Sequence, residues 1–254
     1  MVGSTTESCG AFFMSENFTS AHTSSKRIGL LGGMSAASSQ LYYAELCRLT
    51  QAERGGLSSP DLLLRSLDFA PLEAWMVVGN WDAIADTLSR EASQLQAAGA
   101  EVIALATNTM HNVAGEIEAV LEVPFVHIAD ATAAALNAAG SKTPGLIGTQ
   151  FTMEQTFYLD RLRDYGLDPL VPGAASRSLI NEIIFGELCK GIVLKGSVDA
   201  FIKAATELAF DGADSLILGC TEVCMLLNAD NTPLPVFDTT AIHCEAILKA
   251  AWDY

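Results

Sequence analysis

Short apolar runs alternate along the chain with longer segments of helical periodicity. The longer segments, such as 81–97 and 198–210, are rich in alanine and carry apolar residues at helical spacing. The short runs have the length and composition of strands that are buried on both faces of a parallel sheet. They are residues 27–33, 60–69, 100–109, 123–130, 144–149, 213–221 and 234–240. This alternation predicts an α/β fold in which parallel sheets are flanked by helices.

The same order of segments occurs twice in the chain. The stretch IGLLGGMSAASSQLYYAEL resembles PGLIGTQFTMEQTFYLDRL, and VPFVHIADATAAAL resembles LPVFDTTAIHCEAIL. Matched residues are separated by nearly constant distances, which are 116 residues for Gly29 and Gly145, 113 for Gly99 and Gly212, and 111 for Pro124 and Pro235. Such offsets predict a duplication, with two pseudo-symmetric α/β domains that face each other across a cleft.

Within this repeat, Thr107 corresponds to Cys220, because the two residues are also 113 positions apart. Each follows an apolar run, at the predicted carboxyl end of a parallel strand, where open α/β sheets bind their ligands. If the two halves face each other, these side chains lie on opposite sides of one shared cleft. We therefore interpret them as two copies of one half-site.

Two proton-transfer groups on opposite faces of a carbon atom suit inversion of its configuration. A thiolate is a competent base when the pKa of the thiol is lowered, and N–H groups at a helix start lower it. Thr221 and Glu222 are expected to begin such a helix directly after Cys220. A buried structural cysteine is the alternative for Cys220, and the repeat register favours the catalytic interpretation. Asp130 and Asp238 are expected to cap helices.

Composition restricts the classes of partner. The chain has 254 residues and a net charge of -16, which excludes nucleic acids and anionic membrane surfaces as partners. No apolar run reaches the roughly 18 residues of a membrane span. Six cysteines without a CxxC pair indicate reduced thiols in a cytoplasmic protein. Residues 1–25 are rich in serine and threonine and are expected to form a disordered tail.

Seven short motifs resemble those of the aspartate/glutamate racemases that work without pyridoxal phosphate. The motifs are IGLLGGMS, TNTMHNVA, PFVHIADAT, FTMEQTFY, IIFGELC, GCTEV and PVFDTTAIH, and the resemblance covers about residues 27–250. The likeness is to the bacterial amino-acid racemase branch that carries TNTMH. The resemblance implies inversion at Cα of L- and D-aspartate or glutamate, with no cofactor and no metal.

The resemblance also implies roles for individual residues. Cys220 matches the second catalytic cysteine of the family and acts as the base on the L-face, while Thr107 stands where the family has its first. A threonine hydroxyl is a poor base but can donate a proton on the D-face. The remaining expectations are Asn108, Thr109 and Thr221 for the α-carboxylate, Met34, Ser35 and Glu222 as further substrate contacts, Arg65 and Lys190 for the side-chain carboxylate, and His111 as an assisting residue.

In the family, the two domains exchange their last element. The resemblance therefore implies one domain made of residues 26–123 with 237–254, and a second domain made of residues 124–236. A homodimer is a partner that the sequence leaves open.

Four alternatives follow from the residues. Zinc could bind Cys220, Cys224, His243 and Cys244, but their spacing does not match a structural zinc site. The glycine turns lack the GxGxxG pattern of dinucleotide binding. A single-thiol isomerase or decarboxylase would also keep Cys220 and lack the cysteine at position 107. The fourth alternative is a protein that binds a dicarboxylate without catalysing a reaction.

Overall fold

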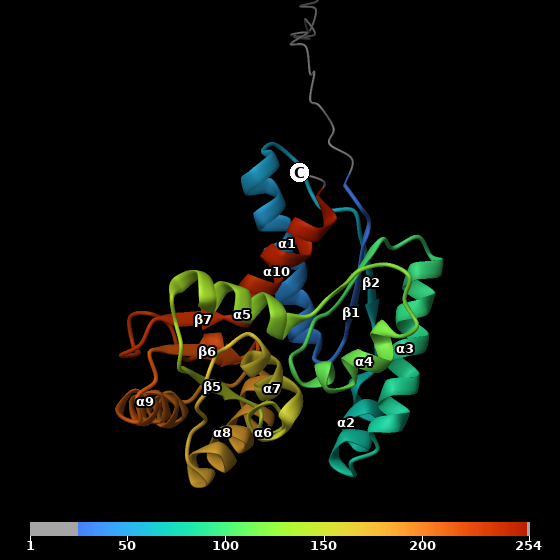
Figure 1. Cartoon of the computed structure of the whole chain (residues 1–254). Helices are drawn as coiled ribbons and strands as arrows, with labels where there is room; N and C mark the ends of the chain where they lie inside the picture. Colours follow the sequence, from blue (N-terminus) through green and yellow to red (C-terminus); the bar gives the residue numbers. More distant parts are fainter. Residues whose placement is uncertain (1–24, 253–254) are drawn as a thin grey trace, which may run out of the picture.

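The computed structural model describes residues 25–252, and it contains two parallel sheets (Figure 1). The first sheet has the strand order β2-β1-β3-β4, and the second has the order β5-β6-β7. The predicted α/β class with parallel sheets flanked by helices is confirmed. Residues 1–24 of the predicted tail, with Cys9, lie outside the described residues. The strands are β1 (Ile28–Gly32), β2 (Leu62–Ser66), β3 (Val102–Leu105), β4 (Phe125–Val126), β5 (Pro144–Gly148), β6 (Ser215–Gly219) and β7 (Val236–Asp238).

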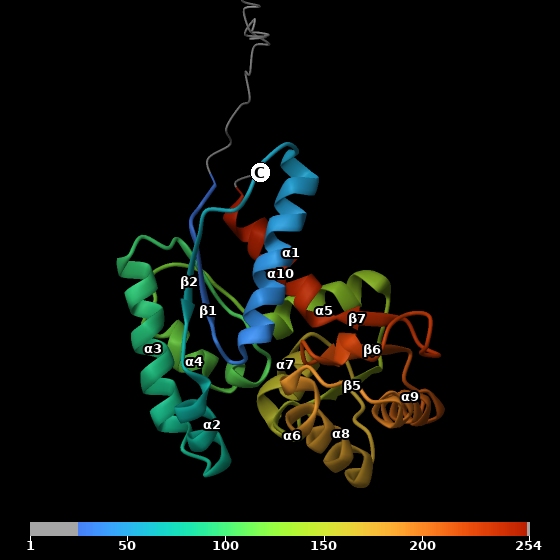
Figure 2. The ribbon, with the colours of Figure 1, turned by 180° about the vertical axis from the view of Figure 1, so that it is seen from behind.

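Helices connect successive strands and cover the sheets (Figures 1 and 2). Among the described residues, none of them is long and apolar enough to cross a membrane. The α-helices are α1 (Ala36–Arg54), α2 (Phe69–Val77), α3 (Trp81–Ala97), α4 (Ala114–Glu118), α5 (Ile128–Ala139), α6 (Gln150–Glu154), α7 (Thr156–Asp164), α8 (Ala174–Gly186), α9 (Lys195–Phe210) and α10 (Thr239–Ala251). Short 3₁₀ turns are η1 (Thr109–Val113), η2 (Leu188–Lys190) and η3 (Val223–Met225).

The duplication inferred from the sequence matches the order of the strands. Strands β1, β3 and β4 are neighbours in the first sheet, and β5, β6 and β7 are neighbours in the second. The offset of 116 residues relates β1 to β5 residue by residue, from Ile28 and Pro144 to Gly32 and Gly148. The helices that follow β4 and β7, α5 and α10, also correspond and pack against each other. The two halves therefore repeat one parallel β-α pattern.

Helix α10 connects the two halves. It follows β7 of the second sheet, yet its buried side chains, among them Cys244, Ile247 and Leu248, share a core with Tyr42 of α1 and with β1 and β3. Figure 2 shows α10 beside α1, and the contacts agree. Strand β4 pairs with β3 of the first sheet, although the expected domain boundary precedes it at residue 123. The domain limits themselves stay a prediction.

All seven strands are shorter than the apolar runs that predicted them, and a helix cap directly ends two of them, β4 and β7. His127 caps α5 through Nδ1, which accepts a hydrogen bond from the Ala129 N–H at 3.1 Å. Asp238 caps α10, as expected, by accepting from Thr240 N–H at 2.8 Å. The expectation that Asp130 caps a helix is wrong. Its carboxylate lies in the first turn of α5 and binds the Arg161 guanidinium at 2.6 and 2.7 Å.

Candidate active site

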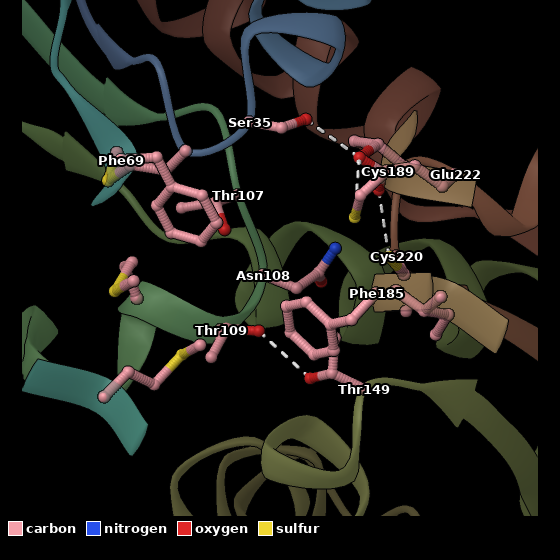
Figure 3. A pocket seen from close by; sticks show the side chains of 16 residues that line it. Ser35, Phe69, Thr107, Asn108, Thr109, Thr149, Phe185, Cys189, Cys220 and Glu222 are labelled. Atoms are coloured by element: carbon pink, nitrogen blue, oxygen red, sulfur yellow. Dashed lines mark hydrogen bonds between the residues drawn. The ribbon is translucent and has the colours of Figure 1, made fainter. Parts of the chain in front are cut away.

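A pocket lies between the two sheets, at the ends of strands from both halves (Figure 3). Thr107 follows β3, Cys220 follows β6, and the two side chains lie on opposite sides of this pocket. Both are almost fully buried, with 8% of each residue exposed. The remaining lining residues are Met34, Ser35, Phe69, Met76, Asn108, Thr109, Met110, Thr149, Ile184, Phe185, Cys189, Gly219, Thr221 and Glu222.

The structure brings together eight of the residues singled out from the sequence. Besides Thr107 and Cys220, these are Met34, Ser35, Asn108, Thr109, Thr221 and Glu222. They share a physical origin, because the loops that follow parallel strands meet at one edge of each sheet. The two halves then present these edges to each other.

The Glu222 carboxylate collects several donors on the Cys220 side of the pocket. The Thr221 hydroxyl donates to Oε2 at 2.5 Å, and the Cys220 thiol donates to the same oxygen at 3.0 Å. The Ser35 hydroxyl, which comes from the other half, donates to Oε1 at 2.9 Å. Cys189 makes a long contact, with Sγ 3.9 Å from Oε1. Glu222 is therefore the centre of the polar network beside Cys220.

The thiol of Cys220 is held in its protonated form. Burial raises its pKa well above the usual value, and the neighbouring Glu222 carboxylate raises it further. The Glu222 main-chain N–H lowers this pKa, as expected of an N–H group after the strand, but burial and the Glu222 carboxylate outweigh it. Residues 223–225 form only the single 3₁₀ turn η3, and the carboxylate contacts the sulfur more closely than any cation does. A negative charge at this distance disfavours a thiolate.

On the opposite side, Thr107 lies in a loop held by its main chain. His111 Nδ1 contacts the Thr107 carbonyl at 2.8 Å, and His111 Nε2 accepts from the Ile128 N–H at 3.2 Å. Nδ1 therefore carries the proton and donates. Burial lowers the pKa of His111, so the ring is neutral. Both ring nitrogens are occupied and His111 does not line the pocket. This placement contradicts the expected assistance in proton transfer and indicates that His111 positions the loop.

Asn108 and Thr109 join the two halves beside the pocket. Asn108 Nδ2 donates to Thr239 Oγ1 at 3.1 Å, and the Thr109 hydroxyl contacts the Thr149 hydroxyl at 3.1 Å. Asn108 Oδ1 is buried and has no hydrogen-bond partner among the described residues.

Arg65 and Lys190, the two expected partners of a side-chain carboxylate, do not line the pocket. Arg65 lies on β2, and its Nε donates to Glu91 at 2.7 Å. Strand β2 is an edge strand of the first sheet. The Arg65 side chain extends from it to Glu91 of α3 and not into the cleft. Lys190 is exposed in η2, next to the lining residue Cys189. Among the lining residues there is no lysine and no arginine.

Several lining residues were not singled out from the sequence. Phe69 begins α2, and Phe185 and Cys189 come from α8 and η2. Thr149 corresponds to Gly33 in the repeat, so the repeat could have identified Thr149 as a residue at a strand end. Phe69 follows β2, which has no counterpart in the second sheet, and Phe185 and Cys189 follow no strand, so the repeat could not identify these three residues.

The residues considered for zinc are bonded elsewhere. Cys224 donates to the Thr221 carbonyl at 2.8 Å, and His243 lies between the Tyr42 hydroxyl and the Val126 carbonyl. Within residues 25–252, no group of three or more His, Cys, Asp or Glu side chains is arranged to hold a metal ion.

Comparison with known proteins agrees with this geometry. The sequence model of the Asp/Glu/hydantoin racemase family matches residues 31–247. The chain belongs to this family. The resemblance seen in the motifs is thereby confirmed.

Relatives cover nearly the whole family region. A Yersinia pestis structure presented as a candidate Asp/Glu racemase is 44% identical, with a TM-score of 0.84 over 89% of this chain and 99% of that one. An aspartate racemase homologue from Pyrococcus horikoshii is 31% identical, with a TM-score of 0.78 over the same shares. The broad specificity amino-acid racemase RacX of Bacillus subtilis is 23% identical over 89% of this chain and 99% of its own length.

Proposed function

We propose that this member of the racemase family inverts the configuration at Cα of free amino acids, without a cofactor. The observation that carries the proposal is the position of Thr107 and Cys220 on opposite sides of one pocket. A substrate carbon between them exposes its two faces to two different proton carriers. Cys220 takes the α-proton of the L-isomer, and Thr107 returns a proton on the other face.

Acidic amino acids are the first candidates for the substrate. Structural relatives at 44% and 31% identity are described as Asp/Glu or aspartate racemase homologues, which supports aspartate and glutamate. Lys190 is the cation that adjoins the pocket in sequence, and rotation of its long side chain would bring the ammonium group toward a side-chain carboxylate. A Lys190→Met variant should then raise KM for aspartate and leave KM for a neutral amino acid unchanged.

Neutral amino acids are a second candidate, favoured by the lining of the pocket. Apolar side chains from both halves surround it, and none of the lining residues is a lysine or arginine. The lining apolar residues are Met34, Phe69, Met76, Met110, Ile184 and Phe185. RacX, a relative at 23% identity, is named a broad specificity racemase.

Exchange of the α-hydrogen in deuterated water tests the proposal. Dialysed protein is incubated with single L-amino acids, and deuterium uptake and the D-isomer are followed separately. Cys220→Ala should remove both signals, whereas Cys47→Ala, in α1 and outside the pocket lining, should keep them. A protein that binds dicarboxylates without exchanging the α-hydrogen would contradict the proposal. Activity that returned only with pyridoxal phosphate or zinc would contradict its cofactor-independent form.

A further inference from the structure

Glu222 is a buried carboxylate in direct contact with the thiol that carries the proposed reaction. Only 5% of the residue is exposed. Three short contacts, from Thr221, Ser35 and Cys220, all come from groups that donate. The Glu222 oxygens therefore act as acceptors in all three contacts. Figure 3 shows its side chain between Ser35 and Cys220.

The resting thiol cannot by itself act as a base. Its proton points at Glu222 Oε2, 3.0 Å from Sγ, and burial favours this protonated form. A sulfur that already carries a proton can accept a second one only if the first leaves. An acceptor within hydrogen-bond distance is therefore required, and Glu222 is the carboxylate that the structure puts there.

We propose that Glu222 is a catalytic residue that takes the Cys220 thiol proton while the sulfur takes the α-proton of the substrate. This inference rests on the proposed racemisation. The S–H bond to the original proton breaks, and an O–H bond forms at Oε2. The Cα–H bond breaks, a new S–H bond forms, and the electron pair remains on the substrate as a carbanion. Negative charge thus passes from Glu222 to the substrate, and reversal of the step restores both groups.

The other donors explain how Glu222 is kept in line with the sulfur. Ser35 both donates to Oε1 and accepts from the Ser38 N–H at 3.2 Å, so it ties the carboxylate to the start of α1. Because Ser35 and Glu222 belong to opposite halves, the pair aligns only when the halves are together. The contact from Cys189, at 3.9 Å, is too long to compete with that from Cys220.

Glu222→Gln tests the proposal because it keeps the size of the side chain and removes the proton acceptor. Hydrogen exchange from an L-amino acid should fall by about a hundred- to ten-thousandfold at neutral pH. The remaining rate should rise about tenfold per pH unit, because the variant must wait for a free thiolate. The wild-type rate should change little over the same alkaline range. Glu182→Gln, the same change at an exposed position of α8, is the matched control and should behave as wild type.

A second measurement needs no substrate. Thiolate formation is followed by its ultraviolet absorbance, with Cys220→Ser subtracted so that only Cys220 contributes. The pH at which half of Cys220 is thiolate should fall in Glu222→Gln, because a neighbouring negative charge is removed. The same midpoint should not move in Glu182→Gln. Glu222→Asp keeps the charge but shortens its reach, and should give a reduced rate with the pH dependence of wild type.

The outcomes separate the two proposals. An unchanged thiol midpoint in a folded Glu222→Gln protein would contradict the coupling of Glu222 to Cys220, whatever the substrate. A raised KM with unchanged kcat and pH profile would overturn the catalytic role and assign Glu222 to binding of the α-ammonium group. Wild-type protein that exchanged no α-hydrogen from any amino acid, while the midpoint still shifted, would instead contradict the proposed function.

Discussion

Thr107 and Cys220 occupy equivalent places in the two halves but differ in their acid–base chemistry. A thiol with a carboxylate acceptor can take a proton from carbon, whereas an aliphatic hydroxyl ionises only far above neutral pH. Thr107 has its backbone fixed by His111, and His111 does not line the pocket. Proton transfer on the Thr107 side should therefore limit inversion.

Thr107→Cys tests this asymmetry. In the wild type, Cys220 should often return a proton to the face from which it was taken, so that the L-isomer exchanges hydrogen faster than it inverts. A thiol at position 107 should raise inversion by about ten- to a thousandfold, toward the exchange rate. Racemisation is measured by chiral chromatography and exchange by mass spectrometry. Thr109→Ser, which keeps a hydroxyl in the same loop, is the control. A variant no faster than the wild type would show that Thr107 does not limit inversion.

At the scale of the elements, the caps fix where strands end and where helices begin. Asp68, His127 and Asp238 each accept a hydrogen bond from the first turn of a helix that directly follows a strand or its short extension. The Asp238 carboxylate accepts from both Thr240 and Ala241. Helix α10 packs against elements of both halves. The cap that begins α10 therefore contributes to the packing of the two halves against each other.

Asp238→Ala should lower the free energy of unfolding by about 1 kcal/mol, the usual contribution of an N-cap. The measurement is denaturation by urea, in which the midpoint should fall while the slope stays the same. Asp86→Ala changes the same charge on the exposed face of α3 and should stay within about 0.5 kcal/mol of the wild type. Equal effects of the two substitutions would show that the cap contributes nothing measurable.

At the scale of the whole molecule, three buried histidines lie where the two halves meet. The ring centroid of His111 is 4.5 Å from that of His127 and 5.8 Å from that of His243. Burial lowers the pKa of His127 to about 3 and that of His243 to about 4. Arg161 lowers the pKa of His127 further, and Asp130 opposes that effect. The junction is therefore built from neutral rings.

Acid should weaken the fold before the carboxylates titrate. The pKa of His243 is lower in the folded state than in the unfolded state, so its stabilising contribution is complete above about pH 6.5 and is lost toward pH 4. For His243 alone the loss is about 3 kcal/mol at the acid end. Urea denaturation at a series of pH values between about 6.5 and 4 measures this loss of unfolding free energy. His243→Gln cannot take up this proton and should show a shallower decline, and an equal decline would contradict the assignment.

The sequence by itself determined the repeat, the succession of strands and helices along the chain, and the correspondence of Thr107 with Cys220. These follow from the local spacing of apolar residues and from the nearly constant separation of matched residues in the repeat, and both are properties of the sequence alone. The α/β class needed nothing more, because strands buried on both faces are read directly from apolar runs.

Only the tertiary structure decided which polar groups reach the pocket and in what protonation state. Arg65 lies on an outer strand and binds Glu91, whereas Cys189 enters the lining from a turn that no strand precedes. Desolvation and the contact with Glu222 raise the pKa of Cys220, although its place in the sequence favoured the opposite shift. Burial and charge proximity depend on residues far apart in the chain, so they exist only once the two halves have packed together.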